Sequence, residues 1–206
     1  MIELFISSLI TFFVVIDPPG CAPIYAGLTA GAPREQVRSM AVRAVLIAGG
    51  ILVVFALFGQ NILGAIGASL DSFRIAGGIL LFVIATEMVL EKRTQRREDR
   101  AQKIVEAHVD DVSVFPMAMP MIAGPGSIAS IMLLMSRGHG IDRTLVILAA
   151  LGVILALTML ALMLAGPIMR VLGDKIEAVV TRLLGVLLAA LATQFVIDGL
   201  RGSFFQ

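Results

Sequence analysis

Six long apolar runs follow one another along the chain, and short polar intervals separate them. Each run holds about 20 largely apolar residues, the length that an α-helix needs to cross the hydrocarbon core of a bilayer. The runs lie near residues 2–29, 38–59, 72–90, 114–136, 144–167 and 181–200. The pattern therefore predicts an all-α integral membrane protein with six transmembrane segments.

The one strongly polar interval divides the chain into two units of three segments each. Residues 1–90 form the first predicted unit, residues 91–113 a charged linker and residues 114–206 the second unit. Ten Lys and Arg residues lie on the first loop, the linker and the fifth loop, against three on the second and fourth loops and the two termini. Because basic loops stay on the cytoplasmic side, we expect a cytoplasmic linker and two periplasmic termini.

The two units carry similar residues at similar spacing. Arg74, two apolar residues and a glycine open the third segment, and Arg182 opens the sixth with the same pattern 108 positions later. Thr86 and Thr193 follow these arginines by 12 and 11 residues. Since each unit has three segments, the second copy enters the membrane from the opposite side, and the pattern predicts an inverted repeat.

Segments one and four are interrupted by proline and glycine at corresponding positions, about 107 residues apart. Proline removes a backbone donor and glycine loosens a helix, so we predict that both helices break within the membrane. Paired breaks indicate a substrate site near the bilayer midplane, and the alternative is that they only kink packed helices. The candidate substrate-binding residues are Asp17, Pro18, Pro19, Gly20, Ala123, Gly124, Pro125, Gly126 and Ser127.

A broken helix offers two complementary ends to a ligand. The start of the resumed half presents N–H donors suited to a carboxylate, and the end of the preceding half presents carbonyls suited to an ammonium group. A small zwitterionic amino acid matches both ends. For Asp17 three roles are open: it binds a substrate amine, it loads a coupling proton, or it caps the half-helix after Pro18 and Pro19 by accepting backbone N–H bonds.

Four other polar residues are candidates for the substrate pathway or its gating. Arg74 and Arg182 either hold the mouths of the pathway or pair with acids at the membrane interface. Thr86 and Thr193 either line the pathway or bond to backbone carbonyls of their own helices.

Composition excludes several classes of function. The chain is 58% hydrophobic and carries a net charge of +1, so nothing indicates nucleic-acid binding. Cys21 is the only cysteine, which rules out an intramolecular disulfide and a CxxC metal site. A nucleophile at Ser127 would need a base within reach, yet His108 and His139 both fall in loops. We therefore expect no enzyme, no metal site and no cofactor, and leave proton or sodium coupling open.

Three motifs, in this order, resemble the MarC family of bacterial inner-membrane proteins, and the resemblance runs from end to end. The motifs are Asp17-Pro-Pro-Gly-Cys-Ala-Pro23, Phe73-Arg-Ile-Ala-Gly-Gly-Ile-Leu-Leu-Phe82 and Pro116-x-Ala-x-Pro-x-x-Ala-Gly-Pro-Gly126. The resemblance implies a neutral amino acid transporter of the kind that acts on glycine and alanine. Many relatives carry Asn-Pro where this chain has Asp17 and Pro18, and because Asn cannot titrate, coupling could differ here.

The leading hypothesis is a secondary carrier or exporter of small neutral amino acids. The alternative is a translocase or channel for another small solute or a lipid precursor. The expected partners are the lipid bilayer and a small-molecule substrate. Gly49-Gly50 and Gly77-Gly78 permit close helix packing, either within one chain or between protomers of a homo-oligomer.

Overall fold

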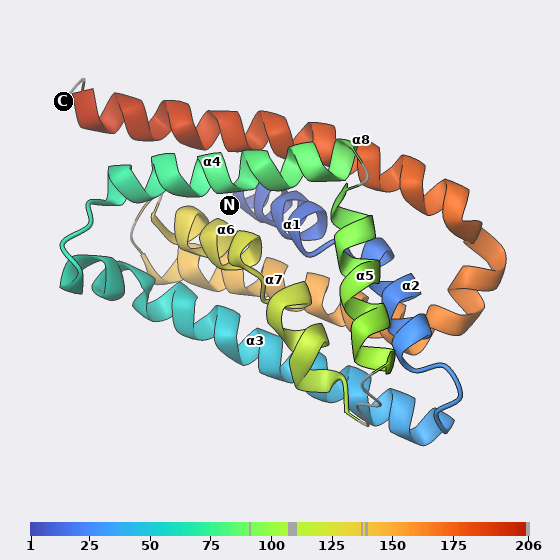
Figure 1. Cartoon of the computed structure of the whole chain (residues 1–206). Coiled ribbons are helices and arrows are strands. Elements are labelled where there is room, and N and C mark those ends of the chain that lie inside the picture. Colours follow the sequence, from blue (N-terminus) through green and yellow to red (C-terminus); the bar gives the residue numbers. More distant parts are fainter. Residues whose placement is uncertain (91, 107–110, 137, 139, 205–206) are drawn as a thin grey trace.

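The structure of the chain is a computed structural model (Figure 1). It describes residues 1–90, 92–106, 111–136, 138 and 140–204, with side chains except at 93–94, 100, 103–106 and 168–178. These residues form helices joined by short connections, and the described part of the chain is all-α, as predicted. In chain order the helices are α1 (Ile2–Ile16), α2 (Pro18–Leu28), α3 (Arg34–Ala65), α4 (Leu70–Val89), α5 (Lys92–Glu106), η1 (Ser113–Ile122), α6 (Pro125–Ser136), α7 (Ile141–Met163) and α8 (Ala165–Phe204).

The apolar runs fold as long helices. One expectation was wrong: α8 begins at Ala165 and continues to Phe204, so the loop expected between segments 144–167 and 181–200 is helical. Within the described residues, five stretches are long and apolar enough to cross a membrane: Ile2–Leu28, Arg34–Ala65, Leu70–Val89, Ile141–Met163 and Val179–Phe204. The number is six if η1 and α6, which are bent by 50° relative to each other, count as one span. Large apolar side chains such as Leu46 and Phe82 also cover the outer faces of these helices, which is typical of helices that face lipid.

The first segment is interrupted at the residue that the sequence indicates. α1 ends at Ile16, Asp17 takes the left-handed conformation (φ 60°, ψ 66°), and α2 begins at Pro18. Pro18 and Pro19 occupy the first two positions of α2, where a helix has no use for the backbone N–H that proline lacks. That this interruption lies inside a bilayer remains a prediction.

The first half of the fourth segment is less regular than the expected helix over 114–136. Within η1 the backbone is extended at Phe115 (φ −129°, ψ 124°) and at Met119 (φ −133°, ψ 126°). Each of these residues precedes a proline, and the proline ring disfavours the α conformation of the residue before it. Regular helix begins only at Pro125, so the expectation of a helix from residue 114 onward was wrong for this half.

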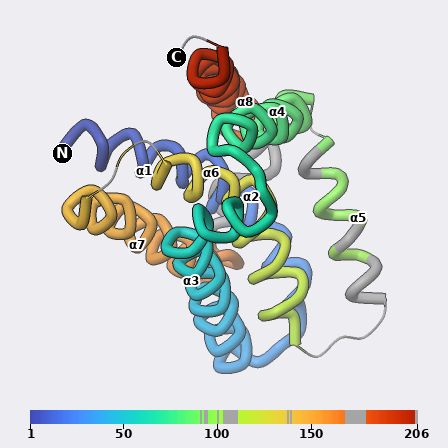
Figure 2. Tube along the Cα trace, turned by 90° about the vertical axis from the view of Figure 1, so that its left-hand side faces the viewer, coloured from blue at the N-terminus to red at the C-terminus, as the bar shows by residue number. Residues whose placement is uncertain are grey.

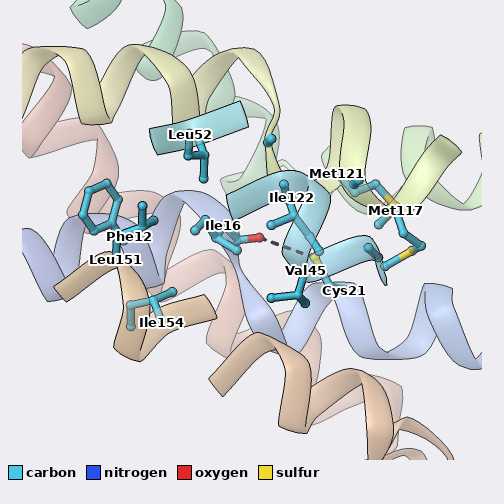
Figure 3. Close-up of a cluster of buried hydrophobic side chains, with 14 of the residues drawn as sticks. Phe12, Ile16, Cys21, Val45, Leu52, Met117, Met121, Ile122, Leu151 and Ile154 are labelled. Carbon is cyan, nitrogen blue, oxygen red and sulfur yellow. Dashed lines mark hydrogen bonds between the residues drawn. The ribbon is translucent and has the colours of Figure 1, made fainter. Parts of the chain in front are cut away.

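The helices pack around α6. The short helix α6 contacts α1, α3 and α4, and most of its side chains are buried. Figure 2 shows α6 surrounded by the longer helices, with α4 and α8 side by side along their lengths. Figure 3 shows the main buried cluster, in which Ile16 and Cys21 from the two sides of the first interruption pack with Ile122 of η1. The two interruptions are therefore neighbours in the folded chain.

The basic connections gather at one end of the bundle. The turn between α2 and α3 lies at the same end as α5, whereas the turn between α3 and α4 lies at the opposite end with the C-terminal end of α8 (Figure 1). This arrangement agrees with the alternation of charge along the sequence. Which end faces the cytoplasm, and whether the two units are related as inverted repeats, remain predictions.

Candidate functional site

Asp17 caps α2 from a buried position. Its side chain is 2% exposed, and its Oδ1 accepts a hydrogen bond of 3.1 Å from the N–H of Gly20. A Cβ atom at Gly20 would lie 2.3 Å from Oδ2 of Asp17, so the position needs glycine for the carboxylate to sit there. The capping role considered for Asp17 is thus observed.

Asp17 also meets an arginine from the linker. Nη1 of Arg97, on α5, lies 3.2 Å from Oδ2 of Asp17, and the side chain of Arg97 is only 12% exposed. The neighbouring Arg96 pairs with Glu87 near the end of α4, where Nη2 and Oε1 are 2.6 Å apart. Two consecutive arginines therefore attach α5 to the end of α1 and to the end of α4.

The second interruption opens onto a pocket below α5, which we call the α5 pocket. It has a volume of about 310 Å³. Its polar and backbone walls come from Glu87, Arg96, Arg97 and the start of α6, and its apolar walls come from α1, α4 and η1. The lining residues are Val15, Leu80, Val83, Ile84, Glu87, Arg96, Arg97, Pro120, Met121, Gly124, Pro125, Gly126 and Ser127.

Glycines at the second interruption allow the close packing around this pocket. A Cβ at Gly124 would lie 2.3 Å from the carbonyl oxygen of Pro120, and a Cβ at Gly126 would lie 2.7 Å from Cδ1 of Ile84 and 3.3 Å from Cγ1 of Val15. The approach of Val15 to Gly126 brings the end of α1 against the start of α6. The residue that touches Gly126 is thus two positions before Asp17, at the end of the helix that the first interruption closes.

The structure collects only part of the predicted binding set in the α5 pocket. Gly124, Pro125, Gly126 and Ser127 line it. Ala123 is buried directly before them. Asp17 does not line the pocket itself, but it forms an ion pair with Arg97, which does. The residues Pro18, Pro19 and Gly20 are not among those that line it.

The four predicted pathway residues lie outside the α5 pocket. Arg74 pairs with Asp71 at 2.7 Å and donates a hydrogen bond of 3.1 Å to the carbonyl of Ser136 at the end of α6. Thr86 and Thr193 are exposed and donate to carbonyls four residues earlier in their own helices, and Arg182 is also exposed. These four residues do not line the α5 pocket. Their role in a substrate pathway remains a prediction.

The linker arginines were not predicted as part of the site. The sequence marks residues 91–113 only as a charged connection, and a charged helix is most often a solvated one. One feature of the sequence could have indicated them. A carboxylate such as Asp17 within an apolar segment is costly to bury without a positively charged partner, and the linker holds the nearby arginines. Within the residues that the structure describes, no group of three or more His, Cys, Asp or Glu side chains could hold a metal ion. His108 and His139 lie outside the described residues.

Asp111 anchors the other end of the linker to α3. Its Oδ2 lies 2.8 Å from Nη1 of Arg43, and its Oδ1 accepts a hydrogen bond of 2.9 Å from the N–H of Ser113. The close contact with Ser113, whose N–H donates this hydrogen bond, holds the pKa of the Asp111 carboxyl below its usual range, and the Arg43 guanidinium contributes less.

A small loss of stability on acidification follows from this pKa. Because the pKa is lower in the folded chain, the carboxylate stabilises the fold at neutral pH, and this contribution is lost as the pH falls through the folded pKa. Both side chains of the pair are about half exposed, so we expect Asp111→Asn to lower the thermal midpoint by only ~2 °C at pH 7. Thermal unfolding in detergent at pH 7 and at about pH 3 tests this, and a difference that grows on acidification would contradict it.

The chain is similar to known membrane proteins over nearly its whole length. Residues 2–204 match the model of the MarC family, described as integral membrane proteins. The UPF0056 membrane protein MJ1677 of Methanocaldococcus jannaschii is 38% identical over 205 residues, which is 98% of each chain. The UPF0056 membrane protein YhcE of Escherichia coli is 34% identical over 95% of this chain and 91% of its own. No solved structure matches the chain.

A third relative is similar over a comparable share of its length. The UPF0056 membrane protein YvbG of Bacillus subtilis is 31% identical over 99% of this chain and 97% of its own. These names describe membrane proteins and mention neither an enzymatic activity nor a transported substrate. The three relatives come from bacteria and from an archaeon, so the similarity does not assign the chain to a bacterial inner membrane. These matches establish that the chain belongs to the MarC family of integral membrane proteins.

Proposed function

We propose that this chain is a secondary carrier of small neutral amino acids, which bind in the α5 pocket. The observation that carries the proposal is the meeting, in one pocket, of the start of α6 with two arginine–carboxylate pairs. The N–H groups of Gly126 and Ser127 lie in the first turn of α6, where no intrahelical carbonyl can accept from them. Together with the Ser127 hydroxyl they form a suitable site for a substrate carboxylate.

The charges around the pocket favour a substrate without net charge. Arg96 and Glu87 form one pair and Arg97 and Asp17 form the other, so these four side chains balance. In a poorly solvated site a substrate with net charge would need an additional counter-charge. A zwitterion brings its own two charges and can exchange partners with the existing pairs, its carboxylate toward arginine and its ammonium group toward Asp17 or Glu87.

The size of the pocket favours a small solute. Its volume of about 310 Å³ is at the lower end of the range for ligand sites. Val15, Val83 and Ile84 narrow it on the apolar side. A long acyl chain would not fit within such walls, which argues against a lipid precursor as the substrate of this pocket.

We infer that the route from the pocket toward the other end of the bundle runs between α1 and α6, and two buried hydroxyl groups support this. Ser8 on α1 and Ser130 on α6 are both 0% exposed. Among the described residues neither hydroxyl has a hydrogen-bond partner, and α1 packs against α6. Unsatisfied buried polar groups are costly and are rare in folded proteins. A polar solute that passes between α1 and α6 would satisfy both hydroxyls.

The α5 helix closes the pocket on the side where the basic loops gather. The pairs of Arg96 with Glu87 and Arg97 with Asp17 hold α5 over the entrance. Release of substrate at this end requires at least one pair to open. The route along α1 and α6 and the entrance under α5 then serve as the two alternating accesses of a carrier.

Counterflow of radiolabelled glycine and alanine in proteoliposomes tests the proposal. We expect the wild type to exchange one or both amino acids, and Gly126→Val to reduce the exchange by at least about tenfold, because the new side chain would fill space beside Val15 and Ile84. Ser127→Ala should raise the half-saturating concentration about fivefold, the effect of one lost hydrogen bond.

Two matched variants control for the general effects of these changes. Gly152→Val adds the same side chain at a glycine with nothing within 4 Å of its Cβ position, and Ser39→Ala removes an exposed hydroxyl on α3. Both should transport like the wild type. Thermal midpoints of all variants identify any that fail to fold. Absence of exchange in a folded wild type, or equal transport by Ser127→Ala and Ser39→Ala, would count against the proposed site.

A further inference from the structure

A second polar pocket lies at the end of the bundle where the basic loops gather, and we call it the basic pocket. It forms where the turn between α2 and α3 meets the turn between α7 and α8, and its volume is about 530 Å³. One wall contains Thr29 and the start of α3, and the other runs from Leu162 to Pro167. None of its lining residues belongs to the α5 pocket.

Two arginines line the basic pocket without an acidic partner. Arg34 and Arg38 are one helical turn apart on α3, so their side chains lie on the same face. Within the described part of the chain neither forms an ion pair, and no carboxylate is among the residues that line this pocket. The neighbouring Glu35 lies about 100° from Arg34 and about 60° from Arg38 around the helix. It does not line the pocket and forms no ion pair with either arginine.

Four other arginines of the described chain do have an acidic partner. Arg43, Arg74, Arg96 and Arg97 each have a carboxylate within 4.0 Å, at distances between 2.6 and 3.2 Å. Among the described arginines, Arg143 and Arg201 also lack an ion pair, but neither lines this pocket. In the basic pocket two guanidinium groups instead face a common cavity, and two arginines in this arrangement favour an anion with several oxygen acceptors, such as a phosphate.

The walls of the basic pocket add an apolar component. Ala26, Val37, Leu162 and Leu164 line it together with the arginines, and Leu164 is 50% exposed. A free phosphate ion gains nothing from these apolar side chains. A phospholipid gains from both components, because its phosphate meets the guanidinium groups while its glycerol and first acyl carbons lie against the leucines.

The location fits a lipid ligand. The pocket lies where the membrane-crossing stretches Ile2–Leu28 and Ile141–Met163 end and where Arg34–Ala65 begins. Lipid headgroups occupy this level of a bilayer, and basic pockets between helices at this level attract anionic headgroups. We propose that the basic pocket binds the phosphate headgroup of an anionic phospholipid, held by Arg34 and Arg38. This site is independent of the transport proposal.

Thermal unfolding in a neutral detergent, with added lipid, tests the site. Wild type should gain about 5 °C in thermal midpoint with saturating phosphatidylglycerol and show little response to phosphatidylcholine. The double variant Arg34→Gln, Arg38→Gln should lose most of this gain. Its lipid-free midpoint should match the wild type, because neither arginine has an ionic partner in the described structure. Native mass spectrometry should show at least a tenfold weaker retention of phosphatidylglycerol by the double variant.

Two controls separate this site from general attraction between charges. Arg201→Gln removes the same group at the opposite end of the bundle, in the last turn of α8, and should keep the full response to phosphatidylglycerol. Inorganic phosphate alone should not reproduce the gain. Equal lipid responses of the double variant and Arg201→Gln would overturn the proposal. An equal gain from inorganic phosphate would overturn the assignment to a lipid and make the site one for a free anion.

Discussion

Replacing Arg97 by glutamine should lower the free energy of unfolding by about 3 kcal/mol, the lower end of the range for removing one partner of a buried ion pair. The variant leaves the Asp17 side chain, which is 2% exposed, without the guanidinium that lies 3.2 Å from its carboxylate. The hydrogen bond from Gly20 remains and offsets part of the loss. For a chain of this size the thermal midpoint in detergent should fall by roughly 6–12 °C.

The adjacent residue provides a matched control for this variant. Arg96→Gln makes the same substitution one position earlier on α5, but the Arg96 side chain is 64% exposed. Its partner Glu87 is 17% exposed, against 2% for Asp17, so the pair is only partly solvated. Because water reaches the guanidinium, we expect a contribution near the upper value of about 1 kcal/mol for exposed pairs and a fall in thermal midpoint of about 4 °C. Equal falls in thermal midpoint for the two variants would show that the buried pair stabilises the fold no more than the partly exposed pair does.

A double-mutant cycle identifies the partner. Asp17→Asn keeps a side-chain oxygen for the Gly20 N–H, and asparagine tolerates the left-handed conformation that Asp17 adopts. Combining Asp17→Asn with Arg97→Gln removes both charges together. We expect the double variant to be more stable than Arg97→Gln alone, with a coupling energy of about 2 kcal/mol. Strict additivity of the two single effects would contradict the ion pair.

Transport by Asp17→Asn tests whether Asp17 also carries a coupling proton. If Asp17 carries the coupling proton, Asp17→Asn should still exchange glycine or alanine in proteoliposomes but should no longer respond to an imposed proton gradient. If Asp17 acts only as a cap and partner of Arg97, the gradient response should survive. The measurement is the counterflow already described, repeated with and without a pH difference across the vesicle membrane.

Much of the fold could be predicted from sequence because hydropathy dominates it. The expected segment 72–90 corresponds to α4 (Leu70–Val89), and the expected segment 144–167 corresponds to α7 (Ile141–Met163). In these helices the length of the apolar run alone sets where the helix lies. The interruption at Asp17 was also predictable, because two consecutive prolines fit only the first turn of a helix.

The sequence pattern failed where tertiary contacts or backbone detail decide the structure. Pro116 and Pro120 lie four residues apart in η1, and the break was predicted only at the glycines that follow. The docking of Arg97 onto Asp17 joins residues 80 positions apart, and no local pattern specifies such a contact. Likewise, glycine pairs indicate close packing without naming the partner helix, and the structure now places Gly78 against α8 of the same chain.

Replacing Gly78 by alanine should destabilise the fold by about 1–3 kcal/mol, because α4 and α8 approach most closely through such glycines. A Cβ at Gly78 would lie 2.7 Å from Cγ2 of Val196, 2.8 Å from the carbonyl oxygen of Ala192 and 2.9 Å from the backbone nitrogen of Val196. Two of these three atoms belong to the backbone of α8, so a side-chain rotation cannot relieve the overlap and the helices must separate. The thermal midpoint in detergent should therefore fall.

The same substitution at Gly50 should stabilise the fold rather than destabilise it. Nothing lies within 4 Å of the Cβ position of Gly50, so alanine meets no obstacle there and gains up to about 1 kcal/mol from its higher helix propensity. Gly199 provides the test of mechanism, because its Cβ position lies 2.8 Å from the carbonyl oxygen of Asp71 on α4. If separation of the two helices is the cost, the double variant Gly78→Ala, Gly199→Ala should lose less than the two single variants added together, since helices moved apart once need not move again. A Gly78→Ala variant as stable as Gly50→Ala would mean that the close approach of α4 and α8 does not exist in the membrane protein.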